Sequence, residues 1–381
     1  MSDFPPLSLY IHFPWCIRKC PYCDFNSHAV ENHSDDYQHY VQALIEDFSA
    51  QYAHLIDRPI ETIFIGGGTP SLLPGKAIKT LLSAIRKKTQ MIDDIEITME
   101  ANPGTVDADH FADYRENGVN RLSIGIQSFD NQALKILGRI HDQDQAVAAY
   151  QTAVSAGFDN INLDLMFGLP HQTLELARRD LRLAMELGPT HLSWYQLTME
   201  PNTPFGHTPP VLPEEEDIDV IQETGLIDLA DSGYERYEVS AFATPGQQCR
   251  HNLNYWEFGD YIGIGAGAHG KLTNSDGHIC RIRKERSPNR YLAAPGQSSG
   301  ETILEPADLP IEFMMNALRL KHGFNPVIFE QRTGLSIKAI EKPLASAVAK
   351  GLLDVTEQRI VATQLGFRFL NDLIGIFDDE Q

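Results

Sequence analysis

Three cysteines near the N-terminus carry the clearest chemical signal in this sequence. Cys16, Cys20 and Cys23 follow a C-x3-C-x2-C spacing, with aromatic residues between and after the thiols. Three thiolates on one short loop can bind three irons of a cubane [4Fe–4S] cluster, which normally takes four cysteine ligands. The fourth iron then has no protein ligand, so a small molecule can bind to it. This arrangement indicates catalysis or cofactor chemistry rather than electron storage.

A structural zinc site and a disulfide are the alternatives for these thiols. Zinc prefers ligands that close a tetrahedron, usually as two C-x2-C-like pairs, whereas only one group of thiols occurs here. The remaining cysteines, Cys249 and Cys280, lie far downstream and do not form a pair. The odd count of 5 cysteines, with no export signal before them, argues against disulfides. The spacing therefore favours an iron–sulfur cluster over zinc.

Length, composition and charge limit the classes of function. The 381 residues suffice for one large domain and a smaller one, and no apolar run approaches the roughly 20 residues that span a bilayer. The net charge of −21 argues against a nucleic-acid partner. Because the chain start resembles no export signal, we expect a cytoplasmic protein with reduced thiols. One basic segment, residues 281–286, is interpreted as a solvated edge, with contact to an anionic group such as a propionate as the alternative.

Strand-like and helix-like segments alternate through the first half of the chain. Short apolar runs bounded by turn residues predict strands, and apolar residues at helical spacing predict helices between them. We expect strands at 7–12, 62–65, 95–100, 121–126, 160–166 and 191–197, and helices at 37–48, 78–85, 108–116, 132–137, 143–155 and 173–186. Six consecutive β/α units imply a parallel sheet with right-handed crossovers, closed or partly closed into a barrel.

The C-terminal ends of these predicted strands carry unusual residues. In parallel α/β folds, ligands bind at that end because the βα loops converge there. A helix cap explains one polar residue at such a position well, but it explains six consecutive units poorly. The sequence therefore predicts a functional site from the cysteines, the glycine triplet Gly66–Gly68, Glu100, Gln127, Asp164 and Gln196.

The pattern changes from about residue 213. A helix with an acidic first turn, a strand at 237–241 and a glycine-rich stretch at 259–270 precede a Pro/Ser/Gly-rich segment, 286–300, interpreted as a linker. The tail predicts helices at 312–320, 325–333 and 337–350, then a hairpin that resembles the wing of a winged helix. We divide the chain into a barrel domain, residues 1–290, and a smaller, mainly helical, winged-helix-like domain, residues 300–381.

The cysteine loop and the segment GGGTP at 66–70 together resemble the radical S-adenosyl-L-methionine (SAM) superfamily. The segments SLYIHFPWC, NLDLMFGLP and GIGAGAHG, which begin at Ser8, Asn162 and Gly263, extend the resemblance to the branch of oxygen-independent coproporphyrinogen III oxidase, HemN. Within that branch the chain is most similar to the HemW subgroup of haem chaperones. The resemblance implies a partial (β/α)6 TIM-like barrel.

The resemblance also implies how SAM binds. Its amino and carboxylate groups would chelate the open iron, and one electron from the cluster would cleave a carbon–sulfur bond to give a 5′-deoxyadenosyl radical. Gly67 and Gly68 would let the backbone approach the methionine part without a Cβ clash. Each implied polar residue, taken alone, fits a helix cap or an ion pair equally well. The further implied SAM contacts are Tyr10, Tyr22, Thr69, Pro70, Glu100, Gln127, Arg139 and Asp164.

Two departures separate the chain from the pattern of coproporphyrinogen oxidase. That enzyme carries a fourth cysteine two residues after the third, where this chain has Phe25. It also has a longer segment before the motif, which contributes to its substrate site. Both departures put porphyrinogen decarboxylation in doubt, and neither affects cluster or SAM binding.

A second motif is the segment His251-Asn252-Leu-Asn-Tyr255-Trp256. Imidazole is a good axial ligand for haem iron, and aromatic rings offer apolar faces to the macrocycle. The resemblance implies that this H-N-x-x-Y-W motif binds haem, although a lone histidine beside aromatic residues is more often a packing residue. Cys249 is either an alternative iron ligand or a small buried side chain. His269 is either part of the floor of the SAM pocket or structural.

Two functions follow from this resemblance. The expected one is a haem chaperone that binds a [4Fe–4S] cluster, SAM and haem, takes electrons from a donor and delivers haem to apo-haemoprotein acceptors. The alternative is oxygen-independent coproporphyrinogen III oxidase, which decarboxylates porphyrinogen propionates by radical chemistry. Whether the radical machinery makes the chaperone an enzyme stays open, as do a homodimer and transient membrane contact.

Overall fold

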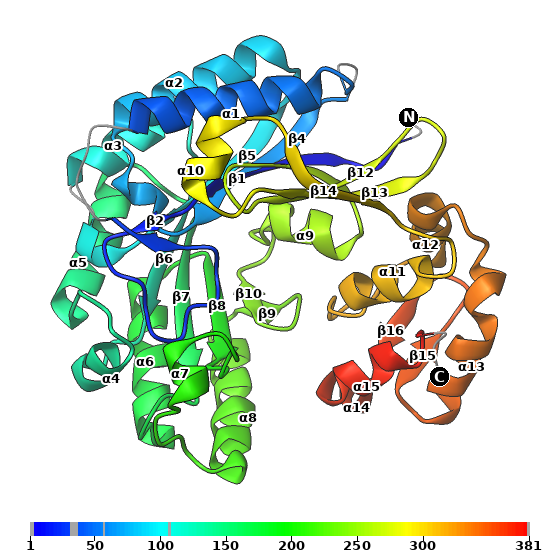
Figure 1. The fold of residues 1–381 in the computed structure, drawn as a ribbon. Coiled ribbons are helices and arrows are strands. Elements are labelled where there is room, and N and C mark those ends of the chain that lie inside the picture. Colours follow the sequence, from blue (N-terminus) through cyan, green and yellow to red (C-terminus); the bar gives the residue numbers. More distant parts are fainter. Residues whose placement is uncertain (1–3, 31–36, 56–57, 106–107, 379–381) are drawn as a thin grey trace.

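A single twelve-stranded sheet forms the centre of the protein (Figure 1). The computed structural model describes residues 4–30, 37–55, 58–105 and 108–378. In order across the sheet, the strands are β14 (Ser298–Ile303), β13 (Ile279–Lys284), β12 (His269–Thr273), β11 (Asp260–Ile264), β1 (Leu7–Phe13), β4 (Ile60–Gly67), β5 (Met91–Ala101), β6 (Arg121–Gln127), β7 (Ile161–Phe167), β8 (His191–Gln196), β10 (Ala241–Ala243) and β9 (Glu235–Arg236).

The predicted parallel sheet of six β/α units is confirmed. β1, β4, β5, β6, β7 and β8 are neighbours in that order, and each pair is parallel. The strand order has two ends, so the sheet is a partial rather than a closed barrel. The main helices of these units are α1 (Tyr37–Tyr52), α2 (Gly75–Lys88), α3 (Ala108–Glu116), α4 (Asn131–Ile136), α5 (Gln143–Ser155) and α6 (Leu174–Leu187).

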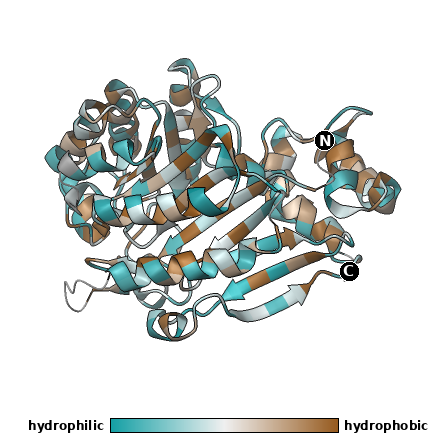
Figure 2. Cartoon of the chain, turned by 90° about the horizontal axis from the view of Figure 1, so that it is seen from above, coloured by the Kyte–Doolittle hydropathy of each residue, from teal (hydrophilic) through white to brown (hydrophobic). Residues whose placement is uncertain are grey.

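Local sequence explains why these elements form. β6 is buried at every position, as expected for a parallel strand covered on both faces. α6 begins where the Thr173 side chain accepts a hydrogen bond from the Leu176 N–H, and it ends at Gly188, which adopts the left-handed φ of 80°. The outer helices carry both hydrophobic and hydrophilic residues along their lengths (Figure 2), as expected for helices between a sheet and solvent.

The second half of the sheet differs from the prediction. β11 pairs in parallel with β1, which extends the parallel part by one strand that the glycine-rich sequence does not reveal. The strand expected at 237–241 is wrong except for Ala241, which begins β10: residues 237–240 lie between β9 and β10, where the Glu238 carboxylate accepts from the backbone N–H and the hydroxyl of Ser240. That local hydrogen bonding folds the chain back where an extended strand was expected.

The expected linker at 286–300 is also wrong. This segment contains α10 (Pro288–Ala293) and the first residues of β14. Tyr291 is buried, and its hydroxyl donates to Asp47 Oδ2 at 2.8 Å, which anchors the segment to α1. Pro, Ser and Gly occur here as turn and cap residues, so composition alone predicts a linker where tertiary contacts build structure.

The tail is mainly helical and carries the predicted hairpin. α8 (Glu215–Asp231) precedes the tail and still covers the barrel. The elements of the tail are α11 (Leu309–Ala317), α12 (Pro326–Thr333), the 3₁₀ helix η3 (Ile337–Ile340), α13 (Glu341–Ala349), β15 (Leu353–Val355), β16 (Ile360–Ala362), α14 (Gln364–Arg368) and α15 (Leu370–Gly375). β15 and β16 pair antiparallel, as the wing-like sequence predicts. The last two helices were not expected. The tail has its own apolar cluster, which also includes Phe258 and Ile279 from the central sheet region. None of the helices in the described ranges combines the length and hydropathy of a membrane span.

Candidate functional site

The cysteine loop lies at the C-terminal ends of the parallel strands. Its two ends meet in the short parallel pair of β2 (Trp15–Cys16) and β3 (His28–Ala29), and the Cys23 N–H donates to the Cys20 carbonyl at 3.2 Å. All three thiols line a cavity of about 330 Å³. Cys16 is buried and the other two are half-buried, so the loop directs its sulfur atoms inward rather than to bulk solvent.

The arrangement of the thiols suits a cluster better than a single ion. Within the described ranges, no three His, Cys, Asp or Glu side chains are arranged to hold one metal ion. A zinc ion needs its thiolates to meet at one point, whereas a cubane cluster binds each thiolate on a different iron. Burial raises the pKa of the Cys16 and Cys23 thiols, and a metal's positive charge is the factor that holds such buried thiols ionised.

Backbone hydrogen bonds join the segment after β4, which includes Gly68 and Thr69, to the start of the cysteine loop. The Gly68 N–H donates to the Phe13 carbonyl at 2.6 Å, and the Thr69 N–H donates to the Trp15 carbonyl at 2.7 Å. A Cβ on Gly68 would lie 2.5 Å from that Trp15 oxygen, and one on Gly67, whose φ is 116°, would lie 2.6 Å from the His12 ring. Both glycines thus allow a close approach of the chain that carries Cys16, and their expected approach to the methionine part of SAM stays a prediction.

All of the predicted SAM residues except Tyr10 line the cysteine cavity. They are Tyr22, Gly67, Gly68, Thr69, Pro70, Glu100, Gln127, Arg139 and Asp164. Nine neighbours that the sequence reasoning missed also line it: Arg18, Ser27, Ala101, Asn102, Ser123, Gly125, Ser193, Tyr195 and Ser240. Alternation along a strand could have identified Asn102, which follows Glu100 by two positions, because such residues share a face.

Arg139 supplies a fixed positive charge to this cavity, whereas Arg18, which also lines it, is exposed. Nη2 of Arg139 donates to the Gly125 carbonyl at 2.7 Å and to Asn102 Oδ1, and its Nη1 donates to Cys20 Sγ at 3.7 Å. Its Nε atom is buried and has no partner among the described residues. The guanidinium is thereby fixed beside the cysteine loop, where it can pair with a carboxylate.

Two carboxyl groups, those of Glu100 and Asp164, line the same cavity as Arg139. Asp164 accepts from Asn162 Nδ2 at 2.8 Å and from the Ser123 hydroxyl at 3.1 Å, and Glu100 accepts from the Gly67 N–H at 2.9 Å. Desolvation and the nearby Asp164 raise the pKa of Glu100 to about 8, and desolvation also raises the pKa of Asp164. A positively charged ligand would restore the ionised forms of both groups. One guanidinium and two carboxyls together suit a ligand that carries both charges.

Gln127 holds its place in this cavity by an unusual backbone conformation. Its φ is 74°, which non-glycine residues rarely adopt, at an irregularity in the pairing of β6 with β7. Its Oε1 accepts from the Tyr195 hydroxyl at 2.7 Å. Backbone strain of this kind concentrates at functional sites.

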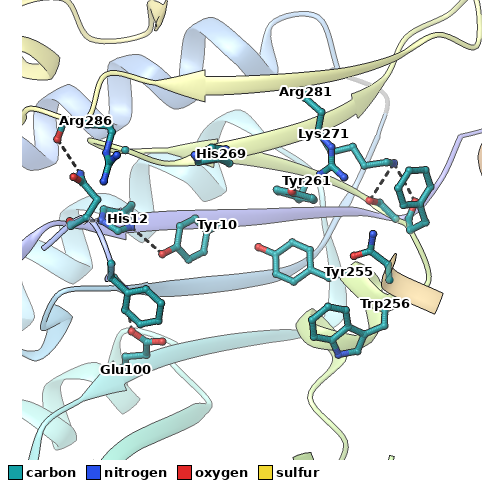
Figure 3. A pocket seen from close by; sticks show the side chains of 17 residues that line it. Tyr10, His12, Glu100, Tyr255, Trp256, Tyr261, His269, Lys271, Arg281 and Arg286 are labelled. Atoms are coloured by element: carbon teal, nitrogen blue, oxygen red, sulfur yellow. Dashed lines mark hydrogen bonds between the residues drawn. The ribbon is translucent and has the colours of Figure 1, made fainter. Parts of the chain in front are cut away.

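A second, larger cavity of about 530 Å³ adjoins the first, and Phe25, Gly67 and Glu100 line both. It lies between the sheet and α9 (Arg250–Trp256), and its labelled side chains are shown in Figure 3. We call it the aromatic cavity because six aromatic rings line it: Tyr10, Phe25, Tyr255, Trp256, Phe258 and Tyr261. Basic and imidazole side chains complete the wall: His12, His269, Lys271, Arg281 and Arg286.

Three predictions change at this cavity. Tyr10, expected at SAM, lines the aromatic cavity, and its hydroxyl bonds to His12 Nδ1 at 2.9 Å. His269 also lines the aromatic cavity and not the cysteine cavity, so it has no part in the floor of the SAM pocket, one of the two roles considered for it. In the basic segment 281–286, Arg281 and Arg286 line this cavity, which agrees with the alternative of contact with an anionic group, and Arg286 is also exposed to solvent.

Only part of the H-N-x-x-Y-W motif lines the aromatic cavity. Tyr255 and Trp256 line the aromatic cavity, whereas His251 and Asn252 do not. His251 is buried, with Nδ1 bonded to Thr62 Oγ1 at 2.7 Å and Nε2 bonded to the Tyr255 hydroxyl at 2.9 Å. Both ring nitrogens are therefore engaged, and the structure does not place His251 as an iron ligand. Instead, this histidine orients Tyr255.

Cys249 is not placed as an iron ligand either. It is fully buried, and burial raises the pKa of its thiol to about 12. Its Sγ lies 3.5 Å from Glu96 Oε1, and the same carboxylate accepts from the N–H groups of Arg250 and His251. A neutral, enclosed thiol of this kind is a packing residue.

Comparisons with known proteins agree with this architecture. Residues 10–184 match the family model of the radical SAM superfamily, and residues 304–369 match that of the HemN C-terminal domain. The chain is 52% identical over 380 residues to the heme chaperone HemW of Escherichia coli K12, covering 99% of each chain. It is 46% identical over 390 residues to the heme chaperone HemW of Haemophilus influenzae, covering 100% of each.

One solved structure is similar over the whole chain. The radical SAM enzyme coproporphyrinogen III oxidase (HemN) from Escherichia coli superposes with a TM-score of 0.84, covering 100% of this chain and 92% of that one. The two sequences are 24% identical. At this identity the likeness shows a shared fold and not a shared reaction.

Proposed function

The chain belongs to the HemW family of the radical SAM superfamily, and on this premise we propose that it is a haem chaperone. The cysteine cavity would hold a [4Fe–4S] cluster and SAM, and the aromatic cavity would hold haem for delivery to apo-haemoprotein acceptors. Because no two of the five cysteines form a disulfide, we place this function in the reducing cytoplasm.

The observation that carries the proposal is the contact between two chemically different cavities. The cysteine cavity has thiols, a guanidinium and two carboxyls, which are the groups that a cluster and a zwitterionic ligand need. The aromatic cavity has flat apolar faces and basic side chains, which suit a flat macrocycle with two carboxylates. Glu100 and Phe25 form part of both walls, so the two ligands would lie next to each other.

Within the cysteine cavity, each group has a definable role. The thiols of Cys16, Cys20 and Cys23 would hold three irons, which leaves the fourth for the amino acid part of SAM. Arg139 would pair with a carboxylate, and Asp164 would accept from hydroxyl groups. When bound, the cluster and SAM together supply one-electron chemistry. The electron must come from a separate donor, because the sequence has no second group of closely spaced cysteines.

Phe25 bears on the choice between a chaperone and an oxidase. It stands where the oxidase pattern has its fourth cysteine, and its ring is 60% exposed on the boundary between the cavities. An apolar ring at this place contacts a macrocycle but cannot bind metal or transfer a proton. We therefore propose haem handling rather than porphyrinogen decarboxylation.

Anaerobic absorption spectroscopy of the reconstituted protein, with and without added haem, tests the proposal. For the reconstituted protein we expect broad absorbance at about 400 nm from thiolate-to-iron charge transfer. When haem is added in stoichiometric amount, we expect a sharper Soret band in addition. Haem-loaded protein should then activate an apo-haemoprotein. Conversion of coproporphyrinogen with SAM and reductant, in the absence of stoichiometric haem binding, would favour the oxidase instead.

The proposed partners need separate measurements. Sedimentation of the haem-loaded protein tests a homodimer, and flotation with lipid vesicles tests transient membrane contact during delivery. The net charge of −21 predicts no affinity for nucleic acid, which a binding assay at low salt checks.

A further inference from the structure

The aromatic cavity presents one imidazole whose ring nitrogens are both free. We propose that this residue, His269, is the axial ligand of haem iron, and that Arg286 pairs with a haem propionate. The inference rests on the proposed function, since it requires haem in this cavity. It replaces His251, which the structure places outside the cavity wall.

The other histidine of the cavity is already engaged. His12 Nε2 lies 3.0 Å from the Asn26 carbonyl, which can only accept, so this nitrogen is protonated and donates. Its Nδ1 then accepts from the Tyr10 hydroxyl at 2.9 Å. Neither nitrogen of His12 has a lone pair left for iron.

The hydroxyls of Tyr255 and Tyr261 and the amine of Lys271 on the wall are also engaged. The Tyr255 hydroxyl bonds to His251, and the Tyr261 hydroxyl accepts from Arg281 Nη1 at 3.0 Å. Lys271 is buried and its Nζ pairs with Asp260 Oδ1 at 2.9 Å. The His269 ring, in contrast, is exposed and makes no hydrogen bond with the part of the chain that the structure describes.

Strand pairing explains why His269 faces the cavity. His269 lies opposite Arg283, and Lys271 lies opposite both Arg281 on β13 and Tyr261 on β11. Residues directly opposite each other, and residues two apart on one strand, project from the same face of a sheet. Figure 3 shows this face above Tyr10 and Tyr255, with His269 between Arg286 and Lys271.

The surroundings keep the imidazole neutral. Partial burial and the guanidinium groups of Arg283, Arg281 and Arg286 lower the pKa of His269. A neutral ring retains the lone pair that binds iron. The same positive charges attract carboxylates, in a chain whose net charge is −21.

Arg286 is the cation best suited to a propionate. Arg281 pairs with Glu312 and Lys271 pairs with Asp260, whereas Arg286 is exposed and has no ion-pair partner among the described residues. With a propionate at Arg286 and the macrocycle against Tyr255 and Trp256, one edge of haem stays at the surface. An acceptor protein could reach the haem from that edge.

Haem titration of four variants tests the assignment. The variants are His269→Ala, His269→Gly, Arg286→Ala and, as a matched control in the turn of the same hairpin, His278→Ala. The probe is ferric haem added anaerobically to the full chain, followed by absorption and electron paramagnetic resonance. Circular dichroism and the iron–sulfur signal report folding independently of haem.

We expect His269→Ala to lose the histidine-ligated spectrum and at least about tenfold in haem affinity. Added imidazole should restore the spectrum of His269→Gly. Arg286→Ala should weaken affinity without changing the ligand spectrum, and His278→Ala should match the wild type. A wild-type spectrum in folded His269→Ala would overturn the assignment while leaving the proposed function intact. Absence of stoichiometric haem binding by the wild type would overturn both.

Discussion

Glu100 is the residue that joins the chemistry of the two cavities. Its carboxyl group lines both, accepts from the Gly67 N–H at 2.9 Å and sits near Asp164. Two carboxyls with raised pKa values beside three thiols make the site costly to fold without its positively charged ligands. The site is therefore a region where function is favoured over the stability of the empty protein.

The pKa of Glu100 predicts a pH dependence of stability. In the folded protein its pKa is raised from 4.5 to about 8, so the folded state binds the proton more tightly than the unfolded state. The contribution of Glu100 to the free energy of unfolding is thus present below pH 4.5 and is lost as the pH rises towards 8. Glu100→Gln keeps an acceptor for the Gly67 N–H but removes the titration.

Thermal unfolding of cofactor-free wild type and Glu100→Gln across this pH range measures the effect. We expect the variant to gain stability relative to the wild type as the pH rises, with the difference levelling off above about pH 8. A difference between the two proteins that does not vary with pH would show that Glu100 does not titrate in this range.

The three loop cysteines should be separable from the fold. Apart from Cys16, they are not buried, and the apolar core lies in the sheet and its helices. Changing Cys16, Cys20 and Cys23 together to Ala should abolish the iron–sulfur absorbance after reconstitution while leaving the circular dichroism spectrum unchanged. Cys280→Ala, in β13, is the matched control and should keep the full signal. Retained absorbance in the triple variant would remove the loop as the cluster site.

The sequence predicts which residues gather at this site better than it predicts how each one points. Most of the implied SAM residues share one cavity, and several of them, such as Glu100 and Gln127, lie at the C-terminal end of a parallel strand, a position that local hydrophobic patterns locate. His251 shows the limit of such reasoning. The motif that contains it has the residue types expected of a haem site, but the Nδ1 atom of His251 is bonded to Thr62, which lies on a strand 189 residues earlier in the chain. No local pattern contains that contact.

At the scale of elements, α9 forms one wall of the aromatic cavity and depends on a single carboxylate. Glu96, buried on β5, accepts from the N–H groups of Arg250 and His251 at 3.1 and 3.0 Å. These are two of the N–H groups that a helix start leaves without partners, and a negative charge also suits that end of the helix. Glu96 therefore positions Tyr255 and Trp256 through the helix.

Removing this carboxylate should loosen α9. We expect Glu96→Ala to lower the free energy of unfolding by about 1–3 kcal/mol, because two buried N–H groups lose their acceptor, and to weaken haem binding. Asp94→Ala is the control, since the exposed Asp94 side chain forms an ion pair with the Arg250 guanidinium, with 3.1 Å between Oδ2 and Nη1. Exposed ion pairs of this kind contribute about 0–1 kcal/mol to stability. Equal destabilisation by the two changes, measured by urea unfolding, would contradict the capping role.

Elements were predictable where local pattern and tertiary structure agree. The six β/α units follow from runs of apolar residues. α5 has the predicted bounds, Gln143–Ser155, because Asp142 and Gln145 form a capping box at its start and Gly157, with a φ of 87°, follows its end. The errors lie where distant contacts decide. β11 becomes parallel only by pairing with β1, and the segment at 286–300 folds only because Tyr291 reaches Asp47.

At the scale of the whole molecule, the two cavities depend on different parts of the chain. Every residue that lines the cysteine cavity lies between Cys16 and Ser240. The aromatic cavity also uses Asn316 on α11, and Phe313 of that helix packs on Phe258 with ring centroids 5.7 Å apart. We propose that residues 1–290 hold the cluster, SAM and most of the haem site, and that residues 300–381 complete the wall of the haem site through Asn316.

Ending the chain after Ile303, which keeps β14 in the sheet, tests this division. The shortened protein should retain the iron–sulfur signal and SAM affinity, because no group of the cysteine cavity is lost. It should lose haem affinity, because Phe258 and Arg281 lose the packing of Phe313 and the ion pair with Glu312. Both properties are measured by anaerobic titration of the same preparation.

Two full-length variants serve as controls, because the shortened chain could lose haem affinity by unfolding as a whole. Asn316→Ala alters only the tail's contribution to the cavity wall, and it should weaken haem binding without affecting SAM. Arg368→Ala breaks an exposed ion pair of 2.7 Å between the tail and Asp219 on α8, away from the cavity, and should leave both affinities unchanged. Unchanged haem affinity in the shortened protein and in Asn316→Ala would show that the barrel holds haem by itself. The tail would then have no part in the haem site, and its fold would serve another step, such as contact with the acceptor.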